Sequence, residues 1–594
     1  MQHRWGGSSW EPTKSMSDAI RAEILAHAAN GSLLHAIFHD FGRRRLEDHE
    51  PTIVMLADLH NGGEIDVLGL VTRDSIQAFQ GQVFWGGQQV YRALIRRIQS
   101  SAEALLHVVQ IIIEAAGQDM AAGMPAEEFS QWCGAEPSRP KELMDLVDRK
   151  VPHSDRFLTI AIKQGVVVDR PYFLDRAHGF LASGSKTETQ AAINALGQIS
   201  CQDDAEWDRL VAAFSDLVAA DDTIRAPLIT AVARHLKDAP PSRRDELTAL
   251  AIAGLKQHGD YTLDTAARTL AFDPEHLPDE LVDALLEALL AIKGENKGTV
   301  EMLDLALMKL VQNGHAERAR RYLEHILRRE QDRIEFEELD SLSYTLRNAG
   351  GRVLEDWVVA WLLDGDYDLC RAMNDALFGA GADEFVFRID FARFSLADTD
   401  YPYLARKAIA TFFLKQSIMA SLLVSLLRSA PAGATDAIVD LLVDPVLINY
   451  AGITDVYLKP ISGDSTDPAQ AAVQRALEGQ EAYLEGLRSI GMVPELHPSE
   501  RERQLEWQRH SDRMAEAWRA ARKKSMLAQI ATESLILYGT RAVSWFKDHT
   551  DEQRRIETPM GRISHSFEMP RVEIVDPIGL QLMLLHFRGE DRPQ

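Results

Sequence analysis

The chain has 594 residues, of which 46% are hydrophobic and 26% are charged, and its formal net charge is -25. A single domain usually has about 100 to 200 residues, so the chain must form several cores or one long array of repeats. The composition argues against global disorder, and the negative charge disfavours unspecific attraction to nucleic acid.

The cysteines and the apolar segments point to the compartment. Cys133, Cys201 and Cys370 lie far apart, so they form neither a disulfide framework nor a paired ligand set for structural zinc. The N-terminus lacks the apolar core of a secretory signal, and the strongest apolar patch, residues 105–116, is shorter than the roughly 20 residues that cross a bilayer. We therefore expect a cytoplasmic protein without a membrane segment.

Residues 186–444 have the periodicity of amphipathic helices. Apolar residues recur three and four apart in segments of roughly 12 to 17 residues, separated by breaks such as Pro240, Pro274 and Gly314. Each such helix must bury its apolar face, so consecutive helices with short loops favour stacked hairpins, here spaced roughly 35 to 40 residues apart. The sequence thus predicts a mainly α protein, an alpha-solenoid of stacked helix hairpins.

This stretch resembles HEAT-like helical-repeat proteins, in which paired helices stack into a superhelix. The resemblance is one of architecture, because the signatures of tetratricopeptide and ankyrin repeats are missing from the helical segments. It covers less than half of the chain. It implies an extended surface suited to binding a protein, and it assigns no partner to particular residues.

The flanking regions differ from the array, and short apolar runs in them do not discriminate between structures. Residues 53–56 and 65–71 fit short strands or pieces of helix. The sequence predicts four parts: 1–185 as a mainly helical N-terminal domain, 186–444 as the HEAT-like array, 445–498 as a linker and helix, and 499–594 as a long basic helix plus a small α+β cap.

The C-terminal cap is predicted to contain strands. Residues 555–558, 562–568 and 572–575 are short segments of strand-like character around turn residues. Asp576 followed by Pro577 is typical of an N-cap with proline at the first helical position, which opens a terminal helix. The cap should therefore combine a few strands with one helix.

Ser499 and Glu502 have the spacing of a capping box and predict a helix that runs to about residue 537. Its basic residues and tryptophans are suited to gripping a phosphate backbone and stacking bases, or to binding an acidic protein surface. Alternatively, it is a solvated face with internal ion pairs whose tryptophans dock on the array. The candidate interaction residues are Trp507, Arg509, Arg513, Trp518, Arg519, Arg522, Lys523 and Lys524.

The most enzyme-like feature is formed by His35, His39 and Asp40. An adjacent His-Asp pair on a helix resembles the centre of HD-type metal phosphohydrolases, in which imidazole and carboxylate groups hold a metal ion that activates water. His27 lies close by in the sequence. The alternative is that these are surface or capping residues of an amphipathic helix.

Two further segments have enzyme-like residue types. Residues 179–187 superficially resemble a phosphate-binding P-loop, but Ser185 separates the glycine from the lysine, and a turn with a capping box of Thr187 and Gln190 fits better. Near the C-terminus, a set of ionisable residues could serve acid–base or metal chemistry if their side chains converge. A simpler interpretation of His565 is a partly buried histidine. That set comprises His565, Glu568, Glu573, Asp576 and His586.

These observations favour a non-enzymatic scaffold or adaptor that binds a protein partner through its helical-repeat surface and uses no cofactor. A second hypothesis is a nucleic-acid-associated component of a bacterial genome-maintenance or antiphage defence system, with residues 499–524 as the contact. A third is an HD-type metal-dependent phosphohydrolase that uses His35, His39 and Asp40.

Overall fold

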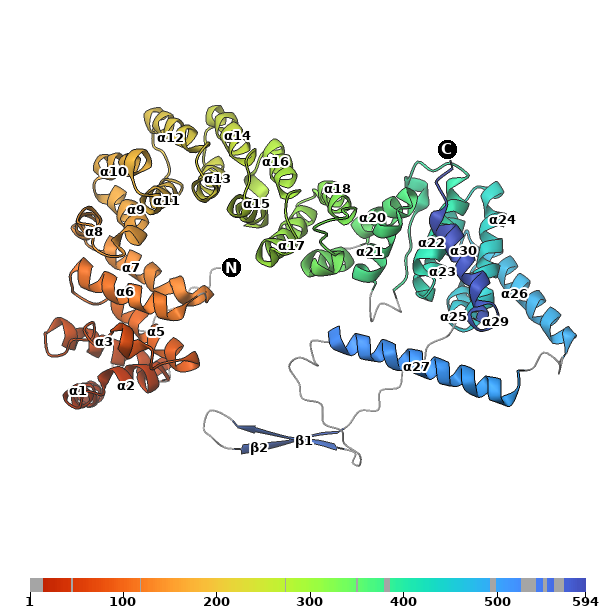
Figure 1. Cartoon of the computed structure of the whole chain (residues 1–594), viewed down its shortest axis with the longest axis horizontal. Coiled ribbons are helices and arrows are strands. Elements are labelled where there is room, and N and C mark those ends of the chain that lie inside the picture. The colour runs from red at the N-terminus through yellow and green to blue at the C-terminus, as the bar shows by residue number, and fades with distance from the viewer. Residues whose placement is uncertain are drawn as a thin grey trace. The chain divides into compact units, whose positions relative to one another are not determined.

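The chain is a helical-repeat protein, as the sequence predicts (Figure 1). The computed structural model describes residues 14–43, 46–117, 119–272, 274–348, 351–378, 385–491, 498–524, 541–547, 553–559 and 571–593. The chain divides into two compact units, residues 1–350 and 351–594. None of the described helices combines the length and apolar character required to cross a bilayer.

The N-terminal unit contains helices throughout its described part. Of the two ambiguous segments, residues 53–56 lie within a helix, and residues 65–71 form an irregular connection with a turn at residues 67–70. The helices are α1 (Lys14–Ala29), α2 (Leu33–His39), η1 (Phe41–Arg43), α3 (Leu46–Asn61), α4 (Arg73–Ile76), α5 (Gly81–Ile95), α6 (Ala102–Ala116), η2 (Met120–Gly123), α7 (Met124–Gly134), α8 (Arg139–Asp148), η3 (Ser154–Phe157), α9 (Leu158–Val168), α10 (Arg170–Ser183), α11 (Lys186–Leu196), α12 (Asp204–Leu217), α13 (Asp222–Leu236), α14 (Pro241–Leu255), α15 (Asp260–Phe272), η4 (Pro274–His276), α16 (Asp279–Leu289), α17 (Lys297–Gln312), α18 (Ala316–Leu327), η5 (Phe336–Glu338) and α19 (Asp340–Asn348).

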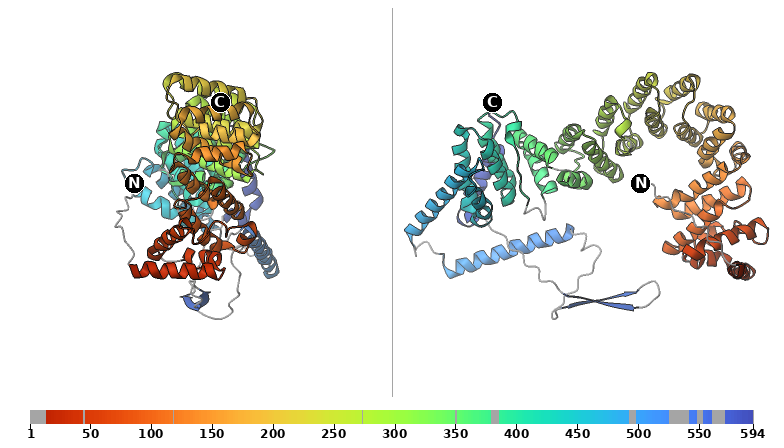
Figure 2. Two further views of the ribbon diagram at one scale, coloured as in Figure 1. Left: turned by 90° about the vertical axis from the view of Figure 1, so that its left-hand side faces the viewer. Right: turned by 180° about the vertical axis from the view of Figure 1, so that it is seen from behind.

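From α9 onward these helices form two layers, which are also visible from behind in Figure 2. Odd-numbered helices pack in series, α9 on α11, α11 on α13, α13 on α15, α15 on α17 and α17 on α19. Even-numbered helices form the second layer, with α10 on α12, α12 on α14 and α14 on α16. The core lies between the layers, where the predicted apolar residues, such as Leu247, Leu285 and Leu303, are buried.

Polar contacts between successive repeats join residues 33 to 35 apart. The Tyr322 hydroxyl donates to the carbonyl oxygen of Leu289, 33 residues earlier, over 2.9 Å. Arg209 pairs with Asp175, 34 residues away, and the next repeat has an equivalent pair between Arg243 and Asp208, 35 residues apart. Equivalent groups therefore meet once per repeat, within or close to the predicted 35 to 40 residues.

Two buried or half-buried aspartates join a helix to the start of the next one in the odd-numbered layer. Asp222 of α13 accepts hydrogen bonds from the backbone N–H groups of Gly259, Tyr261 and Thr262 at 2.9–3.2 Å, and from the Thr262 hydroxyl. Asp304 of α17 likewise accepts from two backbone N–H groups, at 2.9 and 2.8 Å, at the start of α19. Each carboxylate thereby satisfies N–H groups that have no partner within their own helix.

The C-terminal unit contains a second set of packed helices, followed by a long helix, a hairpin and a short helical segment. Its elements are α20 (Arg352–Asp364), α21 (Tyr367–Leu377), η6 (Phe391–Arg393), α22 (Asp400–Phe412), α23 (Gln416–Ser429), α24 (Ala432–Leu441), η7 (Leu442–Leu447), α25 (Ala451–Ser462), α26 (Gln470–Ile490), α27 (Glu500–Lys524), β1 (Arg541–Lys547), β2 (Gln553–Pro559), α29 (Arg571–Val575) and α30 (Pro577–Gly589). Strands β1 and β2 pair antiparallel with each other.

The predicted strand-containing C-terminal cap is wrong. At the end of this unit helix α30 packs on α22, and helix α29 packs on α30. Residues 572–575, expected as a strand, lie in α29, and residues 562–568 lie outside the described residues. A short run such as residues 572–575, in which Glu573 stands among apolar residues, fits either structure. Here the backbone N–H of Val572 anchors the helix by donating to Asn449 Oδ1 over 2.8 Å. The cap that packs on the array is therefore helical.

Replacing Asp222 by alanine should loosen the start of α15. Burial raises the pKa of Asp222, but the hydrogen bonds from Thr262, Tyr261 and Gly259 outweigh it, so the pKa is lowered overall. Because the carboxylate satisfies several N–H groups, its removal should cost about 2 kcal/mol. We expect faster amide hydrogen exchange at residues 259–262, measured by mass spectrometry.

The matched control is Asp208→Ala, which removes an aspartate that is 66% exposed and paired with Arg243. An exposed ion pair contributes roughly 0 to 1 kcal/mol, so exchange in the neighbouring helices should change little. Equal exchange at residues 259–262 in Asp222→Ala and the wild type would show that the aspartate does not hold this junction.

Candidate functional site

Helix α27 begins where the sequence predicts. The Ser499 N–H donates to Glu502 Oε2 over 2.7 Å, and the Glu502 N–H donates to Ser499 Oγ over 3.3 Å, which confirms the capping box. The hydrogen bonds that the Ser499 N–H and hydroxyl donate to the Glu502 carboxylate lower its pKa. The helix is described to Lys524, and the remainder of the predicted helix, to residue 537, lies outside the described residues.

The described side chains from residue 498 to residue 521 are all exposed. Trp507 is 73% exposed and Trp518 is 72% exposed, with Met514 between them at 37%. These three residues are seven and four apart, so at 100° per residue they share one side of the helix. The alternative in which the tryptophans dock on the array does not match their exposure. The side chains of Arg522, Lys523 and Lys524 lie outside the described residues.

The charges on the rest of α27 are balanced up to residue 521. Five arginines are present, Arg501, Arg503, Arg509, Arg513 and Arg519. Five acidic residues alternate with them, Glu500, Glu502, Glu506, Asp512 and Glu516. The net basic character of the helix therefore comes from its last three residues, and its main body combines a tryptophan face with a zwitterionic face.

The chain is anchored on both sides of α27. Before it, α26 packs on α24 and α25, and the Gln480 side-chain amide donates to the carbonyl oxygen of Leu447 over 3.2 Å. After it, α30 packs on α22. Helix α27 thus lies in the segment between residues 491 and 571, and packed helices hold both ends of this segment.

Ion pairs fasten the C-terminal segment, residues 571–592, to α22 (Figure 1). Asp400 is 2% exposed, and both of its oxygens accept hydrogen bonds from Arg592 at 2.8 Å. Arg406 makes two hydrogen bonds to Glu590, at 2.6 and 2.5 Å. Helical periodicity does not match partners that lie 184 and 192 residues apart, so only the tertiary structure shows these ion pairs.

A buried lysine lies at the centre of this contact. Lys407 is 2% exposed, and its ammonium donates to the carbonyl oxygens of Gly365 at 3.2 Å and Arg588 at 2.6 Å. These carbonyls lie at the C-terminal ends of α20 and α30, where the helix dipole favours a positive charge. Burial lowers the pKa of Lys407. The lysine joins two helix ends within the C-terminal unit.

Sequence reasoning missed the outer face of α30. Leu580, Leu584 and Phe587 are buried on one side of this helix, whereas three aliphatic side chains on another side are 58–71% exposed, Ile578, Leu582 and Leu585. The available signal was the run of residues 577–585, which contains no charged residue, because a helix that is apolar all round is expected to be covered on more than one face.

The residues of the possible metal site lie on α2 and at its end. The rings of His35 and His39 stack with their centroids 4.1 Å apart, and Asp40 is the C-cap residue. His27 Nδ1 lies 2.9 Å from Ser32 Oγ. Within the described ranges, no group of three or more His, Cys, Asp or Glu side chains is arranged to hold a metal ion. The metal site stays a prediction.

The set suggested near the C-terminus falls into two parts. His565 and Glu568 lie outside the described residues. Asp576 caps α30, since its Oδ1 accepts from the N–H of Gly579 over 2.9 Å, which confirms the predicted N-cap. His586 lies on an exposed part of α30. The carboxylate of Asp576 therefore has a structural role at the start of this helix.

The P-loop-like residues form helix ends. Residues 179–183 belong to α10, Gly184 follows them, and Ser185 is the N-cap of α11. Ser185 and Glu188 form the capping box, through bonds of 2.7 and 3.4 Å between each backbone N–H and the other side chain. The predicted box of Thr187 and Gln190 is wrong, because α11 begins two residues earlier than that box requires.

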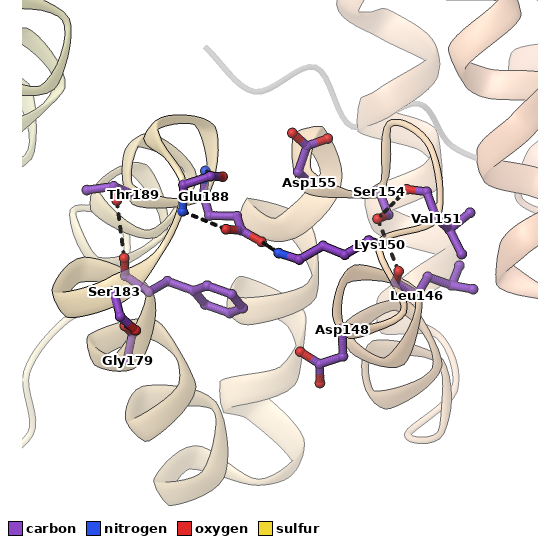
Figure 3. Close-up of polar contacts among 12 residues, drawn as sticks. Leu146, Asp148, Lys150, Val151, Ser154, Asp155, Gly179, Ser183, Glu188 and Thr189 are labelled. Atoms are coloured by element: carbon purple, nitrogen blue, oxygen red, sulfur yellow. Dashed lines mark hydrogen bonds and ion pairs between the residues drawn. The ribbon is translucent and has the colours of Figure 1, made fainter.

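Figure 3 shows the polar contacts around this junction. The Lys150 ammonium forms an ion pair with Glu188, which is 4% exposed. Burial raises the pKa of Glu188, and the hydrogen bonds from Lys150 and Ser185 lower it further than burial raises it. The Ser183 hydroxyl donates to the Gly179 carbonyl oxygen over 3.1 Å. The Lys150–Glu188 pair thus joins α11 to the residue that follows the end of α8 by two positions, whereas the Ser183 bond lies within α10.

No protein-family model matches the sequence, and no curated protein matches it. One similar solved chain belongs to work on a conserved phosphorylation switch that controls the interaction between cadherin and beta-catenin. It is 10% identical, and the match covers 80% of this chain and 97% of that chain with a TM-score of 0.23. A circular tandem repeat protein is 13% identical, with 80% and 95% covered and a TM-score of 0.15. With TM-scores below 0.5, neither match bears on function.

Replacing Asp400 by asparagine should release the C-terminal segment. The hydrogen bonds from Arg592 lower the pKa of Asp400, and burial opposes this effect. The stabilisation by the Asp400–Arg592 pair is therefore fully present above the unfolded pKa of about 3.9. It is lost as the pH falls through the lower pKa that Asp400 has in the folded protein. Breaking a buried pair costs about 3 kcal/mol. We expect amides of α30 to lose protection near pH 7 in Asp400→Asn, and in the wild type only below about pH 4.

Hydrogen exchange of α30, corrected for the intrinsic rate at each pH, measures both effects. The control is Asp436→Asn in the same unit, whose carboxylate is 72% exposed and pairs with Arg475 over 2.7 Å. That variant should leave exchange in α26 and α30 unchanged, because the pair is screened by solvent. Full protection of α30 in Asp400→Asn would contradict the prediction, because the apolar contacts alone would then hold this helix in place.

Proposed function

We propose that this protein is a non-enzymatic adaptor, and that α27 inserts its tryptophan face into an apolar groove of a partner protein. The observation that carries the proposal is the exposure of Trp507 and Trp518 on one side of a capped helix. Tryptophan is enriched among the residues that dominate protein interfaces, because an indole buries a large rigid surface at low entropic cost. Two indoles with Met514 between them have the spacing of anchors in helix-in-groove recognition.

The size of the apolar face is sufficient for specific binding. Burying two indoles removes on the order of 300 Å² from water, which corresponds to roughly 7 kcal/mol before the entropic costs of association. The arginines and acidic residues at the edges of the groove would fix the register and orientation of the helix. Because both ends of the segment between residues 491 and 571 are anchored, α27 would stay attached to the packed helices when the partner binds.

The charge balance favours a protein partner over nucleic acid. Along the described side chains of α27 five acidic groups accompany five arginines, so a phosphate backbone would meet as many repulsive charges as attractive ones. Nucleic-acid affinity depends on an excess of basic contacts, which the main body of this helix lacks. A zwitterionic face is instead typical of helices that pair with charged rims of protein grooves.

The double variant Trp507→Ala/Trp518→Ala should abolish partner binding and leave the array folded. The full chain is immobilised, and proteins captured from the native cell are quantified by mass spectrometry. We expect the proteins specific to the wild type to fall at least roughly tenfold, because two anchor residues are lost. Circular dichroism and thermal unfolding should stay unchanged, since neither tryptophan is buried.

The matched control is Leu505→Ala, which removes an apolar side chain that is 45% exposed and lies about 200° from Trp507 around the helix. Capture should be retained in this variant. Equal capture by the tryptophan variant and the wild type would contradict the proposal. Binding of duplex DNA or single-stranded RNA that falls steeply with salt and with Arg519→Glu would assign the helix to nucleic acid instead.

A further inference from the structure

A groove of about 390 Å³ crosses the odd-numbered layer of the N-terminal unit. Its walls come from α9, from the residues that follow α11, from the end of α13 and from η4. Its floor includes Gly197, where a Cβ atom would lie 2.5 Å from the Cβ of Ala231, so the glycine lets α11 end close against α13. The groove therefore depends on the stacking of successive repeats.

Cationic side chains gather in this groove. Lys163, Arg234 and Lys237 line it together with His276, whereas Asp238 is the acidic residue among the lining side chains. All of these side chains are exposed. The chain as a whole carries a formal charge of -25, so the groove is a local positive surface on an acidic protein. At physiological salt the screening length is about 8 Å, so a ligand in the groove experiences mainly these nearby charges.

The cations of the groove differ from most arginines of the array. Arg170, Arg209 and Arg243 form ion pairs with carboxylates of neighbouring repeats. For Arg234 and Lys237, the part of the chain that the structure describes provides no ion-pair partner. Lys163 donates to the Gln198 side-chain carbonyl over 3.0 Å. The positive charges of the groove are thus left for an external partner.

A purely structural role accounts for only part of this arrangement. Arg234 and Lys237 lie at the C-terminal end of α13, where a positive charge is favoured by the helix dipole. That effect acts within the last turn of one helix. It does not explain why Lys163 of α9 and His276 of η4, which come from other repeats, line the same groove.

The dimensions fit an extended peptide. Neighbouring packed helices lie roughly 10 Å apart, so a groove from α9 past α11 to α13 spans about 20 Å. An extended chain rises about 3.3 Å per residue, so about six residues fit this length. The volume lies within the range of roughly 300 to 1,000 Å³ that is usual for ligand sites.

We infer that this groove binds an extended acidic segment of a partner protein, with Lys163, Arg234 and Lys237 pairing its carboxylates. The inference rests on the proposed adaptor function and adds a second binding surface, in the unit that does not contain α27. The exposed side chain of Ser200 also lines the groove and offers its hydroxyl to a peptide backbone. An adaptor with one surface in each unit binds two partners at the same time.

The test uses the full chain and a fluorescein-labelled peptide with six consecutive glutamates, followed by fluorescence anisotropy at about 150 mM salt. The wild type should bind this peptide and should not bind the equivalent glutamine peptide. Arg234→Glu/Lys237→Glu should weaken binding at least about tenfold, because two attractive charges become repulsive. The neutral variant Arg234→Gln/Lys237→Gln should weaken peptide binding about threefold. This variant tests the inference if charge reversal disturbs the end of α13.

The control variant is Lys256→Glu/Lys293→Glu, which changes the net charge by the same amount at exposed positions outside the groove. Its peptide affinity should equal that of the wild type. Undetectable binding to the wild type, equal affinity in the groove variants, or an equal loss in the control would overturn the inference. Trp507→Ala/Trp518→Ala should bind the peptide normally, so a failure of the α27 proposal is distinguishable from a failure of this one.

Discussion

The constraint on which this structure depends is that each helix has an apolar face that it cannot bury alone. The face is covered only when the next repeat stacks on it, so the odd-numbered helices pack in series and the even-numbered helices form a second layer. Polar contacts fix the register of this stacking. Asp222 and Asp304 each satisfy backbone N–H groups at the start of the following helix in the layer. Apolar burial supplies the stability, and these carboxylates select one alignment.

The same constraint explains the C-terminal segment. A packed helix whose apolar surface is not fully covered by its neighbours in the stack needs another element to cover it. Here α30 packs on α22 with three buried apolar side chains, and ion pairs from Arg592 and Arg406 hold it in place. Because α30 is apolar on another side as well, Ile578, Leu582 and Leu585 remain exposed. The cap covers the array and presents a new apolar surface.

A rigid array leaves function to the parts that its stacking does not use. Several arginines of the array, such as Arg209, Arg243 and Arg318, pair with aspartates of the neighbouring repeat. Residues of enzyme-like type serve as caps, as at Ser185 and Asp576. What remains unpaired stands out against this background. The tryptophan face of α27 and the cations of the groove near α13 are such features, and both are suited to proteins rather than to small-molecule chemistry.

The sequence by itself determined the features that arise within one helix or between adjacent repeats. Helical periodicity indicated the helical-repeat architecture. The cap at Ser499 followed from Glu502 three residues later, and the cap at Asp576 followed from the adjacent Pro577. Local signals failed where two structures fit equally well, as at residues 572–575, or where two capping boxes lie two residues apart, as at Ser185 and Thr187. The tertiary structure decided what depends on distant partners: the contact of Asp400 with Arg592, 192 residues away, and the groove assembled from four segments. Periodicity specifies which face of a helix is buried, but not which distant side chains meet there, because that depends on how all the intervening helices stack.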